Sequence, residues 1–179
     1  MTLDLKQAKD LYAELAASSY VPSNPLAPCI PFMYPVTFCW ARAHDMCRRI
    51  MAKGITPKKI WARAPNTPNN YDYALKIWTA NNPNCEQKWS WHVAPLIEVS
   101  VGNVIEEYVI GPSIFDALAT RSAWELVVTA THNVTGQTKP AIHTVSSWTQ
   151  YQFDDPNFPN NPKLISPYAF NTCTPTIFP

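Results

Sequence analysis

Two residues, Cys39 and His92, have the types and local settings of a thiol nucleophile and its base. A thiol attacks only as the thiolate, and the positive end of a helix is one environment that lowers a cysteine pKa. Thr37 can cap a helix that runs through Cys39 to about Lys53, followed by Gly54 in the left-handed position. We therefore expect Cys39 in the first turn of a helix, as a nucleophile. A buried packing cysteine is the alternative.

The base candidate, His92, lies in the segment WSWHVAPLIEV, whose alternation predicts a strand. The alternation places His92 on one face with the small residues Ser90 and Ala94, which leave room for a substrate. A half-buried histidine with a purely structural role is the alternative. We expect packing, structural or surface roles for the other three histidines, which are His44, His132 and His143.

A histidine base also needs a carboxylate or amide that fixes its tautomer and stabilises the imidazolium. If the predicted hairpin over residues 88–110 has a two-residue turn, Ser113 lies opposite His92. Gly111 is then diagonal to His92 on the same face. The place expected for the orienting group is therefore occupied by glycine.

Composition and charge limit the classes of function. The net charge of +1 gives no basic excess for binding nucleic-acid phosphates. No stretch reaches the roughly 18 apolar residues of a membrane span, and the start MTLDLKQAKD lacks the pattern of a signal peptide. The four glycines never cluster, so no P-loop or dinucleotide fingerprint exists. We expect a soluble protein without nucleic-acid partners. It is either cytoplasmic or secreted, and the secreted class includes exported effectors.

The cysteines and histidines show no metal-ligand spacing, so we expect no metal and no other cofactor. If Cys39 is a free nucleophile, four cysteines remain, which suffice for two disulfides but fit equally well as reduced, buried residues. These four are Cys29, Cys47, Cys85 and Cys173.

The remaining patterns predict one domain over 1–179 with an α+β fold, in which the helix that carries the nucleophile packs on a mainly antiparallel sheet. Residues 1–30 hold an N-terminal helix and a Pro-rich lead-in, and 155–179 form a Pro-rich C-terminal tail. A capping box of Ser122 and Glu125 predicts a second helix start. The predicted helices are 3–18, 37–53 and about 123–131, and the predicted strands are Lys59–Ala64, Tyr73–Thr79, 88–101, 104–110 and 141–153.

Three ordered blocks between Pro31 and Phe115 resemble the bacterial protein-glutaminase family: PFMYPVTFCWARAHDMCRRIM, WSWHVAPLI and YVIGPSIF. That family has a papain- and transglutaminase-like fold and uses Cys, His and Asp in this chain order. The resemblance implies that Cys39 is the nucleophile and His92 the general base and acid. The family's third block usually ends in Asp-Pro-Ser, whereas this chain has Gly111 where the aspartate would stand.

The resemblance further implies a protein-glutamine deamidase, monomeric and acting on exposed glutamine through a thioester, with activity reduced by Gly111. Ser113, Asp116 or a water are candidates to orient His92 instead. Trp40 and Trp91 are expected to flank the substrate groove. Two alternatives stay open: an acyl transferase or cyclase with the same thioester chemistry, and a non-catalytic protein that only binds a partner.

Overall fold

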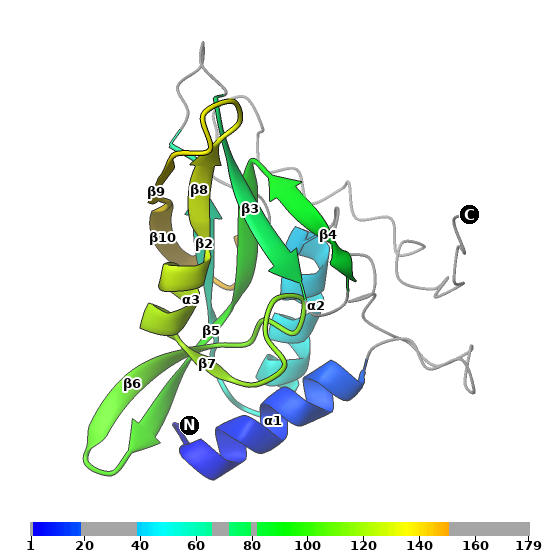
Figure 1. Cartoon of the computed structure of the whole chain (residues 1–179). Helices are drawn as coiled ribbons and strands as arrows, with labels where there is room; N and C mark the ends of the chain where they lie inside the picture. The colour runs from blue at the N-terminus through cyan, green and yellow to red at the C-terminus, as the bar shows by residue number, and fades with distance from the viewer. Residues whose placement is uncertain (1, 19–38, 66–71, 80–81, 151–179) are drawn as a thin grey trace.

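The computed structural model describes residues 2–18, 39–65, 72–79 and 82–150, which form helices packed on two sheets (Figure 1). Within these ranges the helices are α1 (Leu5–Ala17), α2 (Cys39–Ala52) and α3 (Arg121–Val127). The strands are β1 (Leu3–Asp4), β2 (Lys58–Arg63), β3 (Tyr73–Thr79), β4 (Asn82–Trp89), β5 (Trp91–Val101), β6 (Val104–Val109), β7 (Ala119–Thr120), β8 (Thr129–His132), β9 (Thr138–Pro140) and β10 (Ile142–Ser147).

The larger sheet has the order β10-β2-β5-β6-β7, with the short β1 added to β5. The smaller sheet has the order β4-β3-β8-β9. All pairs in the described ranges are antiparallel except β1 with β5. The α+β class with a mainly antiparallel sheet is therefore confirmed. No helix in these ranges is long and apolar enough to cross a membrane.

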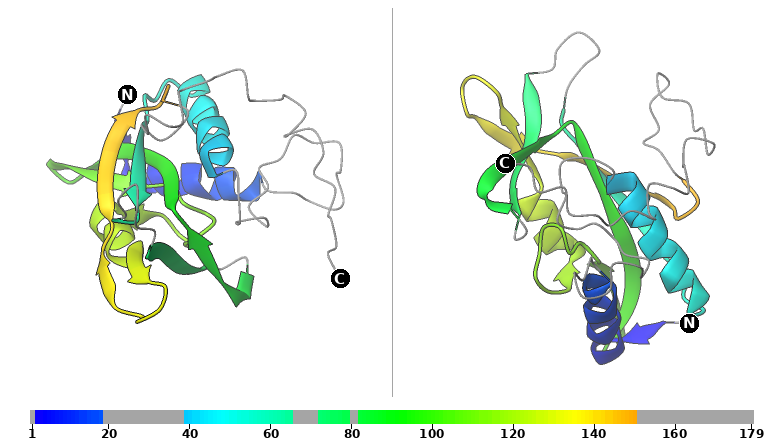
Figure 2. Two further views of the ribbon diagram at one scale, coloured as in Figure 1. Left: turned by 90° about the horizontal axis from the view of Figure 1, so that it is seen from above. Right: turned by 90° about the vertical axis from the view of Figure 1, so that its right-hand side faces the viewer.

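Strand β5 is the centre of the fold, because both of its faces are covered. On one face Val93 packs against the start of α2, and Ile97 and Val99 pack against α1 and the rest of α2. On the other face Ala94 and Leu96 pack in a cluster with α3. In the right panel of Figure 2, the green strand β5 runs between α3 and α2. A side chain on β5 therefore belongs to either the α2 face or the α3 face.

The β5–β6 hairpin has the predicted two-residue turn. Val101 pairs with Val104, and Gly102 has the positive φ of 61° that this turn requires. The helices α1 and α2 also form close to their predicted ranges. Asp4 caps α1 in a capping box with Gln7.

The capping box predicted for α3 is wrong. Thr120, not Ser122, caps the helix, and its hydroxyl accepts a hydrogen bond of 3.2 Å from the N–H of Ala123. Glu125 instead pairs with Arg121 at 2.7 Å on the helix surface. The helix is also shorter than predicted, because the run of Thr and Ala that follows pairs with β3 and β9 as strand β8.

Two predicted strands also differ from the structure. The strand predicted over 88–101 breaks at Ser90, so Trp89 ends β4 in the smaller sheet and Trp91 begins β5 in the larger one. The segment predicted as 141–153 forms the edge strand β10, with β9 before it. The cap at Thr37, the lead-in and the tail lie outside the described residues.

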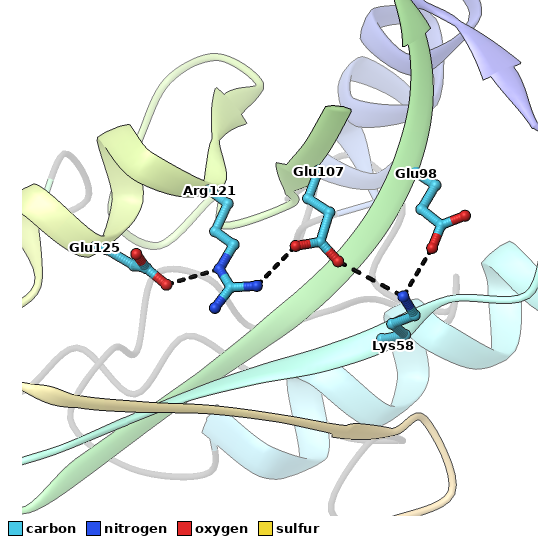
Figure 3. A network of polar contacts seen from close by, with 5 residues as sticks. All are labelled: Lys58, Glu98, Glu107, Arg121 and Glu125. Atoms are coloured by element: carbon cyan, nitrogen blue, oxygen red, sulfur yellow. Dashed lines mark hydrogen bonds and ion pairs between the residues drawn. The ribbon is translucent and has the colours of Figure 1, made fainter. Parts of the chain in front are cut away.

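An ion-pair network connects β2, β5 and β6 to α3 (Figure 3). Lys58 bonds Glu98 at 2.7 Å and lies 3.6 Å from Glu107. Arg121 bonds Glu107 and Glu125, each at 2.7 Å. Such half-exposed pairs are each worth less than about 1 kcal/mol. Together they hold α3 in register with the sheet.

Candidate active site

The nucleophile candidate, Cys39, is the first residue of α2 in the described part of the chain. Its side chain is buried against Ala43, one turn further along the helix, and against Trp61 and Val93 of the sheet. The helix places Cys39 at this point because the apolar positions of α2 recur at helical spacing and face β5. Cys39 therefore lies on the α2 face of β5.

Burial dominates the electrostatics of Cys39. It raises the pKa of the thiol from about 9 to about 11, because the thiolate would lose its hydration. The positive charge of Arg42 opposes this increase, as do the backbone N–H groups of Trp40, Val93 and Cys39 itself. Two of these N–H groups belong to the start of α2, which is the environment expected for a nucleophile. In this state the thiol is protonated at neutral pH.

The base candidate, His92, is 3% exposed, and its ring stacks on Trp89 with centroids 4.4 Å apart. Trp124 of α3 lies beyond it, 6.3 Å between ring centroids. Burial, followed by the charge of Arg42, lowers the pKa of His92 to about 3, so the ring is neutral at neutral pH. Its Nδ1 atom is buried and has no hydrogen-bond partner among the described residues.

Cys39 and His92 share one neighbouring residue on β5. Val93, which directly follows His92, packs against Cys39. The ring of His92, however, lies on the α3 face with Trp124, and no hydrogen bond between Cys39 and His92 occurs in the structure. Catalytic hydrogen bonds in unliganded enzymes are often long and tighten only with substrate bound.

Arg42 is a site residue that the sequence analysis missed. It is 2% exposed and lies three residues after Cys39 on α2. Its charge lowers the pKa of both Cys39 and His92, so the guanidinium lies within electrostatic range of both. The available signal was a charged residue on the otherwise apolar inward face of the helix.

Gly111 lies where the chain leaves β6 and turns. Its carbonyl accepts hydrogen bonds from the N–H groups of Ile114 and Phe115, at 2.9 and 3.0 Å. A Cβ atom added to Gly111 would meet Trp124 Nε1 at 3.7 Å and Val109 Cγ1 at 4.0 Å, which are ordinary contacts. Neither the space nor the backbone conformation at this position requires glycine.

Neither predicted substitute for an orienting carboxylate forms a hydrogen bond or a ladder pair with His92 in the structure. The β5–β6 ladder ends at the pair Leu96–Val109, so the predicted pairing of Ser113 with His92 does not form, although Ser113 is buried. Asp116 is exposed, and its charge raises the pKa of Tyr12 on α1. The charges that shift the pKa of His92 do not include Asp116.

The two predicted groove residues lie next to Cys39. The rings of Trp40 and Trp91 have centroids 5.8 Å apart, and Trp91 lies 5.6 Å from Trp61. Trp40 and Trp91 are half-buried and pack against the cluster that contains Cys39. They therefore form an aromatic surface beside the sulfur.

His44, His143 and Cys47 occupy structural positions. His44 Nδ1 lies 3.3 Å from Lys59 Nζ, within hydrogen-bond distance. His143 stacks edge-on against Trp124, with centroids 5.6 Å apart. Cys47 is a free, buried thiol, so it joins no disulfide. The described residues include no cluster of His, Cys, Asp and Glu that could hold a metal ion.

Comparisons with known proteins agree with one another. A family model described as glutaminase matches residues 8–128. A crystal structure of protein-glutaminase has a TM-score of 0.72 and 25% identity, covering 100% of this chain and 95% of that one. The NMR structure of protein-glutaminase from Chryseobacterium proteolyticum has a TM-score of 0.67 and 25% identity, covering 99% and 94%.

A third solved structure, a crystal structure of a mutant of pro-protein-glutaminase, has a TM-score of 0.68 and 27% identity. The match covers 84% of this chain and 50% of that one, so the matched part of this chain spans half the length of that mutant pro-protein. No curated protein matches the sequence.

Proposed function

Because the chain belongs to the protein-glutaminase family, we propose that it deamidates glutamine side chains of proteins or peptides through a thioester on Cys39. The observation that carries this proposal is the position of Cys39. Its side chain lies at the start of α2, where backbone N–H groups act to lower the pKa of the thiol, and it packs against the strand that supplies His92.

The proposed reaction has two steps. In the first, the ring of His92 turns from the α3 face toward Cys39 and takes the proton of its thiol, and the sulfur attacks the carboxamide carbon. The C–N bond then breaks, and the nitrogen takes the proton from His92 and leaves as ammonia. In the second step, His92 deprotonates a water, which attacks the thioester. The C–S bond breaks, the proton returns to the sulfur, and the product is glutamate.

Backbone N–H groups near Cys39 would stabilise the oxyanion of each tetrahedral intermediate. The N–H groups of Cys39 and Trp40 lower the pKa of the thiol, and we expect them to stabilise the negative charge of a substrate oxygen bound beside the sulfur as well. Arg42 adds a buried positive charge near the same atoms.

We infer that turnover is low in the form with Gly111. Both partners are neutral at rest, with pKa values of about 11 for Cys39 and about 3 for His92, so forming the thiolate and imidazolium is unfavourable. Replacing the orienting carboxylate of a serine-protease triad costs about 10⁴ in turnover. Cysteine enzymes whose nucleophile is already ionised depend less on that group.

Ammonia release from a glutamine-containing peptide tests the proposal. Cys39→Ala should abolish the release, whereas Cys47→Ala should retain it. Cys47 is a matched control because it is a buried cysteine of the same helix that takes no part in the proposed site. Release that persists in Cys39→Ala would contradict the proposal.

The same experiment separates the alternatives. An acyl transferase would incorporate an added primary amine into the peptide as it released ammonia, whereas a deamidase would yield glutamate. A non-catalytic protein would release no ammonia, and its peptide binding would survive Cys39→Ala.

A further inference from the structure

We propose that the space beside Gly111 is a binding subsite for a small free carboxylate such as formate, which accepts hydrogen bonds from the rings of His92 and Trp124. The subsite itself depends only on the geometry. Its catalytic consequence rests on the proposed function, because the bound ion would orient His92 as a side-chain carboxylate does in a triad.

The first observation is a pair of buried, unpaired donors. Trp124 is wholly buried, and its Nε1–H has no hydrogen-bond partner within the described ranges. The same holds for Nδ1 of His92, which donates in the tautomer that carries its proton there. Buried polar groups in folded proteins normally have hydrogen-bond partners. Two unpaired nitrogen atoms on rings whose centroids lie 6.3 Å apart therefore require an explanation.

The second observation is a glycine next to one of these donors, with room for at least one further carbon atom. Gly111 has no side chain, and its nearest neighbour in the direction of a Cβ is the unpaired Trp124 Nε1, at 3.7 Å. Its backbone is fixed on both sides. The preceding N–H, of Ile110, bonds the carbonyl of Pro95 at 3.0 Å, and the Gly111 carbonyl accepts two hydrogen bonds. The backbone at this position is therefore held in place by hydrogen bonds.

The local charge favours an anion over a neutral ligand. The guanidinium of Arg42 is buried and lies within electrostatic range of His92. A planar carboxylate has two oxygens and can accept from both rings at once. Formate is the smallest ion with this group, and it matches the end of an aspartate side chain.

A bound carboxylate would change the properties of His92. An adjacent negative charge favours the imidazolium, so the pKa of His92 would rise from about 3 toward its ordinary value. The hydrogen bond would also hold the proton on Nδ1, which leaves Nε2 as the basic nitrogen. Both effects favour proton transfer from a thiol.

NMR titration with sodium formate, compared with sodium chloride at equal ionic strength, tests the subsite without substrate. We expect a saturable shift of the Trp124 indole N–H signal and a rise in the pKa of His92 with formate alone. Gly111→Asp should abolish both responses, because its own carboxylate fills the position. Trp124→Phe removes one donor and should weaken the formate effect on His92, and it serves if Gly111→Asp does not fold.

The inference is overturned if formate gives no saturable shift, if chloride gives an equal one, or if Gly111→Asp responds as the parent does. Ammonia release provides a second readout, and formate should increase it at least about tenfold in the parent, within the roughly 10⁴-fold that a triad carboxylate can supply. Formate binding without ammonia release in any form would support the subsite and count against the deamidase.

Discussion

Acid should destabilise this fold mainly through His92. Its pKa is about 3 in the folded protein, whereas an unfolded histidine titrates near 6.5. Because the folded-state value is the lower one, the unfolded chain binds the proton first as the pH falls. The stabilisation from a neutral His92 is therefore complete above pH 6.5 and is lost progressively between pH 6.5 and about 3.

The size of the effect follows from the interval between the two pKa values. Each pH unit within that interval costs about 1.4 kcal/mol of unfolding free energy. At pH 4, about 2.5 units below the unfolded pKa, the loss is about 3 kcal/mol, and it approaches about 5 kcal/mol below pH 3. No reduction for solvent screening is needed, since His92 is 3% exposed.

Urea unfolding followed by tryptophan fluorescence at pH 7 and pH 4 measures this loss. The control is His92→Gln, which keeps a polar side chain but cannot titrate. His44 and His143, whose pKa values are also lowered, titrate in both proteins and cancel in the comparison. The parent should lose about 3 kcal/mol more than the variant between the two pH values. Equal losses would refute the buried, neutral state of His92.

Three further predictions concern the cap of α3, the hydrogen bond between Tyr12 and Phe115, and the thiol of Cys39. Thr120→Ala should lower the free energy of unfolding by about 1 kcal/mol, and Ser122→Ala by less than about 0.5 kcal/mol, because only Thr120 caps α3. Urea denaturation measures both changes, and a larger loss in Ser122→Ala would contradict the assignment of the cap. Tyr12→Phe should lower the free energy of unfolding by about 1–2 kcal/mol, since it removes the 2.6 Å hydrogen bond from the Tyr12 hydroxyl to the Phe115 carbonyl. Thermal unfolding measures the change, and an unchanged Tm would show that this hydrogen bond is dispensable. The rate of alkylation of Cys39, monitored by peptide mass mapping, should rise about tenfold per pH unit from pH 7 to 10, because the pKa of its thiol is about 11. A rate that is already constant near pH 7 would mean a preformed thiolate.

Local patterns predicted the elements whose signals lie within a few residues. Gly102 and Asn103 specify a two-residue turn, and that turn fixed the register of β5 and β6. The apolar spacing of α2 likewise placed Cys39 at the buried start of a helix. In each case the determining residues are neighbours in sequence, so no tertiary information was needed.

The predictions from sequence were wrong where contacts between residues distant in the chain determine the local structure. Ser90 gives no local sign that the chain changes sheets there, since both flanking segments have strand character. Ser113 lies where an extended ladder would place it opposite His92, but the turn that begins at Gly111 removes it from the ladder. Trp124 approaches His92 only because α3 folds back onto the sheet, and no spacing along the chain encodes that contact.

The room left beside Gly111 also bears on how this site can evolve. Every glycine codon becomes an aspartate or glutamate codon when its second base changes to adenine. The protein would receive a new Cβ without a steric clash and without a change of backbone conformation. The scaffold therefore keeps an acidic group one mutation away, so loss and recovery of a carboxylate beside His92 are both accessible to selection without any rebuilding of the fold.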